Sequence, residues 1–326
     1  MHMSDALLAP EVGAAFWLAS GATIAYASRK VKQHLDQRMV PLMGVLGAFV
    51  FAAQMINFTI PGTGSSGHLA GTTLLAILLG PHAAFLTISS VLTVQALLFA
   101  DGGILALGAN MFNLGVLPCY LVYPLLYPRL ASSKEGFLQP TPLAAFMVAL
   151  VSLQLGSLGV VVETTLSGIA ELPFVAFVTV MQPIHLAIGG VEGFVTLVVL
   201  GFLQKAYPDI HRRDSQEDQR LSRVVGGVLV AAMVTGGVLS WYASENPDGL
   251  EWSLAKVTKG KELSTTSNAH QVAGEVQKGV AVLPDYQVPE QENSSRLGTS
   301  VAGLLGGLVT LLMAASLGWL LRRRKG

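Results

Sequence analysis

Apolar stretches long enough to cross a membrane recur along the whole chain and are separated by short polar segments. A bilayer core requires about 20 apolar residues per helix, so the pattern predicts nine membrane-spanning helices. The predicted spans run over 11–28, 40–58, 69–80, 83–100, 105–126, 141–163, 183–204, 224–243 and 299–321. The third is short for a full crossing and should stop at Gly80-Pro81. We expect an all-α, polytopic helical membrane protein.

Composition agrees with this class of protein. The chain is 52% hydrophobic and only 12% charged, whereas soluble proteins carry about 25% charged residues. The formal net charge is zero, which gives no electrostatic reason to expect a nucleic-acid partner. The single cysteine, Cys119, lies in an apolar run and cannot form an internal disulfide. The expected environment is a lipid bilayer.

The basic residues set the orientation, because lysine and arginine concentrate in cytoplasmic loops. With the N-terminus outside, 15 of the 20 basic residues lie in inner segments, and the other five lie in one long loop, 244–298. An odd number of spans then places the C-terminus in the cytoplasm. No basic residue precedes the first apolar run, so we expect a retained first helix rather than a cleaved signal peptide.

The spans divide into two groups. Residues 1–205 contain seven spans, a charged cytoplasmic linker occupies 206–223, and residues 224–326 contain two spans around the outer loop 244–298. This loop is rich in Ser, Thr, Gln, Lys and Glu and has little with which to build a core, so a small or partly ordered element is expected. The organisation suggests a two-part, fused protein.

The first two residues, Met1-His2, form a candidate metal chelate. The amine of Met1, the amide nitrogen of His2 and its ring Nδ1 would supply three nitrogen donors in one plane. Square-planar nitrogen sites suit Ni(II) or Cu(II), whereas Mg²⁺ and Ca²⁺ prefer oxygen ligands. A free α-amine has a pKa of about 7.7–8.0, so capture should weaken as the pH falls. A histidine at position two can equally be chance.

His68 is the candidate for the fourth donor. It follows a glycine-rich loop, 61–67, between an outgoing and an incoming span, on the same side as the N-terminus. Glycine permits backbone shapes that other residues resist, so the loop could fold inward and present His68 in a buried pocket. The alternative is an ordinary capped histidine at a membrane interface.

The same loop formally matches G-x-G-x-x-G, but a membrane helix precedes it where the dinucleotide motif requires a strand. We therefore expect no nucleotide site there. No G-x-x-x-x-G-K-[ST] sequence occurs anywhere in the chain, so any ATP that drives transport would be hydrolysed by another polypeptide.

Polar residues within the spans are candidates to support the site, because intramembrane polar groups usually face the bundle interior. Asn57 is favoured, since it lies beside the glycine loop and a ligating imidazole normally donates its other N–H to a fixed acceptor. Gln95 and Asn110 are further candidates. Interhelical hydrogen bonding is the alternative for each. His185 and Glu192 share a helix face and could pair.

Histidines elsewhere are expected to have no part in the site. His82 should lie at the inner side, and His34, His211 and His270 lie in polar segments and should be solvated. In the second span, Gly44, Ala48 and Ala52 recur every four residues, which allows another helix to approach closely. That helix could belong to a partner or to this chain.

Several segments resemble the CbiM/NikM family, the substrate-binding components of energy-coupling-factor transporters for cobalt and nickel. The resemblance rests on Met1-His2, Gly67-His68-Leu, Gln95-Ala-Leu-Leu-Phe-Ala-Asp-Gly-Gly103 and Leu107-Gly-Ala-Asn110 and covers about residues 1–205. Asn246-Pro-Asp-Gly-Leu-Glu-Trp252 resembles the signature of the small two-span partner of NikN or CbiN type. The whole chain resembles a fused protein of NikMN type.

The resemblance implies a seven-helix part that holds the metal with the Met1 amine, the His2 amide and ring, and His68. It also implies three partners, a transmembrane coupling protein and two cytoplasmic ATPases, and contact with the coupling protein through a small-residue helix face. Many relatives begin Met-His-Ile-Met-Glu-Gly, whereas this chain reads Met1-His-Met-Ser-Asp-Ala6, so positions three to six support no inference.

The sequence thus predicts a non-enzymatic subunit of an ATP-driven importer. Nickel is favoured over cobalt because a low-spin square-planar field suits it. The rivals are a stand-alone proton-coupled carrier, which predicts an inverted repeat that we do not find, and an intramembrane enzyme, for which no H-E-x-x-H or serine–lysine pattern is present.

Overall fold

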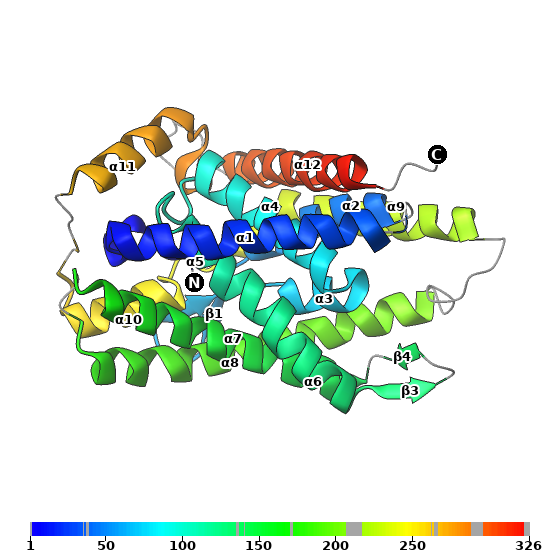
Figure 1. Cartoon of the computed structure of the whole chain (residues 1–326), viewed down its shortest axis with the longest axis horizontal. Helices are drawn as coiled ribbons and strands as arrows, with labels where there is room; N and C mark the ends of the chain where they lie inside the picture. Colours follow the sequence, from blue (N-terminus) through cyan, green and yellow to red (C-terminus); the bar gives the residue numbers. More distant parts are fainter. Residues whose placement is uncertain are drawn as a thin grey trace.

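The structure is a computed structural model that describes residues 2–34, 36, 39–134, 137–139, 141–169, 172–206, 217–261, 263, 267–287 and 296–322. Long helices run side by side along the longest axis of the molecule (Figure 1). The described helices of eight or more residues are α1 (Pro10–His34), α2 (Met39–Gln54), α3 (Thr72–Leu79), α4 (Pro81–Leu98), η2 (Phe112–Val122, π-helical), α6 (Tyr123–Leu130), α7 (Pro142–Ser167), α8 (Phe174–Ala206), α9 (Glu217–Gly237), α10 (Gly249–Thr258), α11 (Asn268–Val280) and α12 (Arg296–Leu321).

Short elements connect these helices. They are η1 (Asp5–Leu7), α5 (Leu107–Met111), η3 (Leu239–Tyr242), η4 (Pro284–Tyr286) and two antiparallel hairpins, β1 (Phe58–Ile60) with β2 (Ser65–Gly67) and β3 (Ser132–Lys134) with β4 (Phe137–Gln139). In the first hairpin Phe58 pairs with Gly67 and Ile60 with Ser65.

Each predicted span coincides with a helical stretch, which confirms the all-α membrane fold. Five of these stretches are long and apolar enough to cross a bilayer: 81–98, 107–130, 142–167, 174–203 and 296–321. Two further apolar helices, within α2 and α9, are shorter. The seventh span was placed too short, because α8 begins nine residues before position 183 and continues through Pro183.

The third span is a half-helix, as its length suggested. α3 has eight residues and ends at Gly80, whose φ of +75° is unfavourable for residues with a side chain, and Pro81 starts α4. The chain between α2 and α3 is exposed at the turn of the β1–β2 hairpin and becomes buried again from Ser65 to Gly67 and at Ala70. This re-entry is what brings His68 inward.

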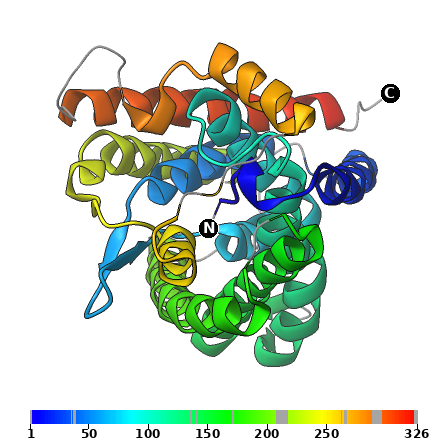
Figure 2. The same cartoon turned by 90° about the vertical axis from the view of Figure 1, so that its left-hand side faces the viewer.

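One end of the bundle carries α10, α11 and the loops next to the start of the chain, and the opposite end carries the β3–β4 hairpin (Figure 1). We call the first the outer end, following the predicted orientation. Figure 2 looks onto it: α7 and α8 form one side, and α2, α9 and α12 form the other. The polar loop 244–298 is more ordered than expected, since it contributes α10, α11 and η4.

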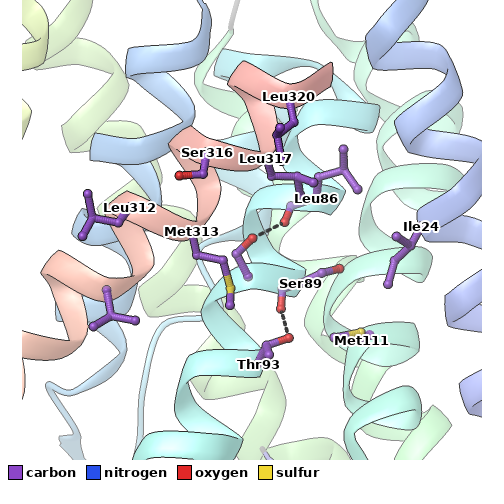
Figure 3. Close-up of a pocket in the computed structure, with 12 residues that line it drawn as sticks. Ile24, Leu86, Ser89, Thr93, Met111, Leu312, Met313, Ser316, Leu317 and Leu320 are labelled. Atoms are coloured by element: carbon purple, nitrogen blue, oxygen red, sulfur yellow. Dashed lines mark hydrogen bonds between the residues drawn. The ribbon is translucent and has the colours of Figure 1, made fainter. Parts of the chain in front are cut away.

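An apolar groove of about 580 Å³ runs between α1, α4 and α12 (Figure 3). Ile24, Leu86 and Met313 are among its lining side chains. The hydroxyls of Ser89, Ser90 and Thr93 donate to carbonyls of their own helix, so they are already hydrogen-bonded. The lining contains no ionisable residue, and we therefore place the functional site elsewhere, at the outer end.

Candidate metal site

The start of the chain is bound into the outer end by its backbone. The N–H of Met3 donates to Oδ1 of Asn110 at 2.8 Å, and the Asn110 amide donates back to the Met3 carbonyl at 3.1 Å. The Gly103 N–H donates to the same carbonyl at 2.9 Å. The Met3 side chain is fully buried. Asn110 therefore holds the backbone of Met3, the residue that follows His2. Its side chain supports the candidate ligands through this contact.

A second set of contacts holds η1. Oδ1 of Asp5 accepts from the Ala106 N–H at 2.9 Å. His270, from α11, places Nε2 at 3.0 Å from the Asp5 carbonyl and 2.9 Å from the Leu8 carbonyl, so Nε2 carries the proton. The expectation that His270 is solvated was wrong: it is buried, because α11 folds back over η1.

The β1–β2 hairpin turns through Gly62 and Gly64, whose φ angles are +78° and +74°. Gly67 then passes so close to α8 that an added Cβ would lie 2.4 Å from Cγ1 of Ile188. Beyond His68, the N–H groups of Ala70 and Gly71 donate to the two carboxylate oxygens of Glu192 at 2.8 and 3.1 Å. The loop that carries His68 is thus fastened on both sides of the histidine.

Glu192 and His185 therefore do not pair as suggested from their shared helix face. Glu192 holds the loop backbone, and Nδ1 of His185 lies 2.8 Å from the Met181 carbonyl one turn earlier in α8. A carbonyl oxygen can only accept, so Nδ1 of His185 is the protonated nitrogen.

The imidazoles of His2 and His68 meet at the outer end. Their rings are stacked, with centroids 5.0 Å apart and planes inclined by 7°. Both side chains are almost fully buried, at 5% and 9% exposure. Residues 66 positions apart in the sequence are therefore brought into direct contact.

His68 has the protonation state that a metal ligand requires. Its Nδ1 lies 3.1 Å from the Leu69 carbonyl and must donate to it, which leaves the lone pair on Nε2. Burial lowers the pKa of His68 to about 3. The ring is therefore neutral at neutral pH, with an unprotonated Nε2.

His2 is paired with a carboxylate. Its Nδ1 lies 3.1 Å from Oδ1 of Asp101, and its Nε2 is buried without a hydrogen-bond partner among the described residues. Oδ2 of Asp101 accepts from the Tyr286 hydroxyl at 2.5 Å. Burial alone would raise the pKa of Asp101, but the His2 ring and the Tyr286 hydroxyl outweigh it and hold that pKa below its usual range.

A second carboxylate faces the other histidine. Oδ2 of Asp248, at the start of α10, lies 3.9 Å from Nε2 of His68. Sequence reasoning assigned no role to Asp101 or Asp248, although both lie in segments that carry the family resemblance. The available signal for Asp248 was its spacing from Glu251, which is typical of a capping box at a helix start.

The other predicted supporting residues act less directly. The Gln95 amide donates to Gln54 at 2.7 Å, and Gln54 donates to the Ala70 carbonyl at 2.7 Å, so Gln95 supports the His68 loop through one intermediate. Asn57 contributes its backbone carbonyl, which accepts from the Ser244 N–H at 2.7 Å. Met1 lies outside the described residues, and its role as a ligand stays a prediction.

Gly44, Ala48 and Ala52 are covered by this chain itself. An added Cβ on Gly44 would lie 3.0 Å from Cβ of Ala315 and 3.1 Å from the Leu311 carbonyl, both in α12, and the two alanines are buried. Packing within the chain accounts for their spacing. Contact with a partner subunit at these residues would require α12 to move.

The donor set fits a nitrogen-preferring divalent transition metal. Two buried imidazoles meet beside the start of the chain, whereas no cluster of three His, Cys, Asp or Glu side chains suited to an ion occurs in the described part of the chain. A complete site would need main-chain donors as well. Coordination through Nδ1 of His2 would require that ring to leave Asp101. Within the described part of the chain, the site combines two imidazoles with two carboxylates, whereas Ca²⁺ prefers a cage of oxygen ligands.

Comparisons with known proteins identify the family of the chain. Residues 2–210 match the CbiM family, described as "Cobalt uptake substrate-specific transmembrane region", and residues 222–323 match the PDGLE domain. The chain is 30% identical to a putative fused nickel transport protein NikMN of Archaeoglobus fulgidus, over 97% of this chain and 98% of that protein. It is 37% identical to a putative metal transport protein of Haloquadratum walsbyi, over 64% of this chain and 93% of that protein.

Solved structures show the same likeness. A crystal structure described as a transition metal transporter is 29% identical and superposes with a TM-score of 0.56, covering 69% of this chain and 99% of that one. Fold and site together define a multi-pass membrane protein of metal-ion transport. The chain belongs to the CbiM family of prokaryotic nickel and cobalt transport proteins and carries a PDGLE domain after it.

Proposed function

We propose that this chain is the substrate-specific membrane subunit of an ATP-driven energy-coupling-factor importer and captures a divalent nickel ion at its outer end. The observation that carries the proposal is the stacked pair His2–His68, with centroids 5.0 Å apart in a buried position next to the start of the chain. The nickel-transport names of full-length fused relatives support nickel as the ion. Cobalt is the alternative, since other relatives are named cobalt transport proteins.

The proposed ligands are the Met1 amine, the His2 amide and ring nitrogens, and Nε2 of His68. The hydrogen bond from Nδ1 of His68 to Leu69 supports this set, because it directs the lone pair of Nε2 away from the Leu69 carbonyl. Four nitrogens in a plane would favour Ni(II). Asp101 would release Nδ1 of His2 as the ion binds.

Transport would depend on separate subunits. The sequence carries no phosphate-binding loop of the G-x-x-x-x-G-K-[ST] type, so two cytoplasmic ATPases acting through a transmembrane coupling protein would supply the energy. These partners would reshape or tilt this subunit so that the ion leaves toward the cytoplasm.

Isothermal titration of the purified protein with Ni²⁺ and with Co²⁺, together with metal analysis, tests the proposal. We expect one ion per chain, tighter binding of Ni²⁺, and loss of binding in His2→Ala and His68→Ala, with His82→Ala as the control. Co-purification with an ATPase separates this importer from a carrier that works alone. Unchanged Ni²⁺ binding in both ligand variants would contradict the proposed site.

A further inference from the structure

Near the beginning of the outer loop 244–298, Asp248 caps the N-terminus of α10. Oδ1 of Asp248 accepts from the N–H groups of Leu250 and Glu251, each at 2.8 Å, and the Glu251 carboxylate accepts from the Asp248 N–H at 3.2 Å. This reciprocal pair is a capping box. It fixes one oxygen of Asp248 to α10 and determines where the other oxygen lies.

The helix start is docked tightly against α8. An added Cβ on Gly249 would lie 2.7 Å from Cγ2 of Ile184, 3.0 Å from Cδ1 of Ile188 and 3.2 Å from Cε1 of His185. The next residue, Leu250, is buried in the main apolar core. Only glycine permits this approach at position 249. The close packing of Gly249 on α8 therefore fixes the position of the neighbouring Asp248 relative to the helix bundle.

The same segment is hydrogen-bonded to the hairpin that precedes His68. The Ser66 N–H donates to the Pro247 carbonyl at 2.8 Å, and its hydroxyl donates to the Asn246 carbonyl at 2.7 Å. The Trp252 indole donates to the Thr63 carbonyl at 3.0 Å. The His68 loop and the start of α10 therefore form one connected unit, although they are about 180 residues apart.

Within this unit, Oδ2 of Asp248 lies 3.9 Å from Nε2 of His68. Nε2 carries the lone pair, because Nδ1 donates to Leu69. The distance of 3.9 Å between these two atoms is too long for a hydrogen bond. Ligand bonds from a divalent transition metal to nitrogen or oxygen measure about 2.0–2.2 Å. An ion bound to Nε2 would therefore lie close to the carboxylate.

We propose that Asp248 belongs to the ion site as a positioning residue, through which the C-terminal part increases affinity for a divalent cation. This inference rests on the proposed capture of nickel by His2 and His68. The proposed nitrogen ligands include one negative donor, the deprotonated amide, so the bound ion keeps positive charge in a buried place. The carboxylate of Asp248 attracts that charge, and the capping box keeps it in position.

The test compares two variants of the same capping box in the full-length protein, each titrated with Ni²⁺ alone. Asp248→Asn removes the charge and keeps an oxygen that can cap α10. Glu251→Gln also removes one charge and keeps the capping box, since glutamine serves at that position, but the carboxylate that lies 3.9 Å from His68 is that of Asp248. A second substitution, Asp248→Ser, retains a capping group in a smaller side chain.

We expect the Ni²⁺ dissociation constant to rise about tenfold or more in both Asp248 variants and to change less than twofold in Glu251→Gln. The melting temperature without metal and the ligand-field absorption of bound Ni²⁺ should stay at their wild-type values, which a merely structural role of Asp248 would not predict. A dissociation constant within twofold of wild type in Asp248→Asn and Asp248→Ser would overturn the inference and leave the proposed function standing. Absence of Ni²⁺ binding in the wild-type protein would instead overturn the proposed function.

Discussion

At the scale of single residues, the site depends on groups that hold histidines in place as much as on the histidines themselves. The predicted orientation put His2 and His68 on one side of the membrane, and the structure stacks their rings. Asp101 and Asp248 could not be assigned in the same way, because each reaches its histidine through packing of segments far apart in the sequence. The residues next to Asp101 and Asp248 in the sequence do not indicate that packing.

Asn110→Ala should weaken Ni²⁺ binding about tenfold or more. The substitution removes both hydrogen bonds to the Met3 backbone and leaves a buried N–H without its acceptor, which costs about 1–3 kcal/mol. Each 1.4 kcal/mol corresponds to about a factor of ten in affinity. Titration calorimetry measures the change.

Asn57→Ala is the matched control for that substitution, since Asn57 contributes its backbone carbonyl to the Ser244 contact and alanine keeps that group. If the two substitutions changed the Ni²⁺ affinity equally, the hydrogen bonds of the Asn110 side chain to Met3 would not contribute to Ni²⁺ binding.

At the scale of elements, the re-entrant connection between α2 and α3 is the feature that builds the site. The short third span and the glycine-rich loop indicated such a re-entry from sequence. The fastening of the loop could not be predicted, because Glu192 and Ile188 come from α8 and were assigned to no contact with residues 67–71. The polar composition of 244–298 also concealed that α10 and α11 dock on the outer end.

Gly67→Ala should destabilise the loop that carries His68. The new methyl group would lie 2.4 Å from Cγ1 of Ile188, so the hairpin and α8 must separate. Overpacking of this kind costs about 1–3 kcal/mol, and the displaced histidine should bind Ni²⁺ more weakly. We expect a lower melting temperature and about a tenfold higher dissociation constant.

Gly190→Ala, in the same helix, is the control for the Gly67 substitution, because a methyl group there meets nothing within 4 Å. If Gly67→Ala had the same melting temperature and Ni²⁺ dissociation constant as Gly190→Ala, the close approach of the hairpin to α8 would contribute neither to stability nor to Ni²⁺ binding.

At the scale of the whole molecule, the two parts of the chain are interlocked rather than joined end to end. α12 packs along α2 and contacts α9 and α4, while Asp248, which caps α10, lies 3.9 Å from His68, and Tyr286 of η4 donates to Asp101, the carboxylate paired with His2. The charged linker and the two groups of spans were visible in the sequence. The pairing of α2 with α12 was not, since small residues on both helices permit close packing without specifying the partner.

Gly44→Leu tests what the small-residue face of α2 contacts. A leucine there would collide with Leu311 and Ala315 of α12, so we expect a melting temperature several degrees lower in the isolated protein. Gly21→Leu, in α1 with nothing within 4 Å of its added Cβ, should be tolerated. An unchanged melting temperature combined with loss of ATPase co-purification would instead assign this face to a partner subunit.

The central claim is that an ion is held by the start of this chain together with His68. The most direct measurement is titration of Ni²⁺ into a protein that carries one additional alanine before Met1, compared with the unextended protein. The extension moves the free amine away from His2 and keeps both histidines in the chain. The account predicts that Ni²⁺ binding is lost in the extended protein, and an unchanged dissociation constant would contradict it.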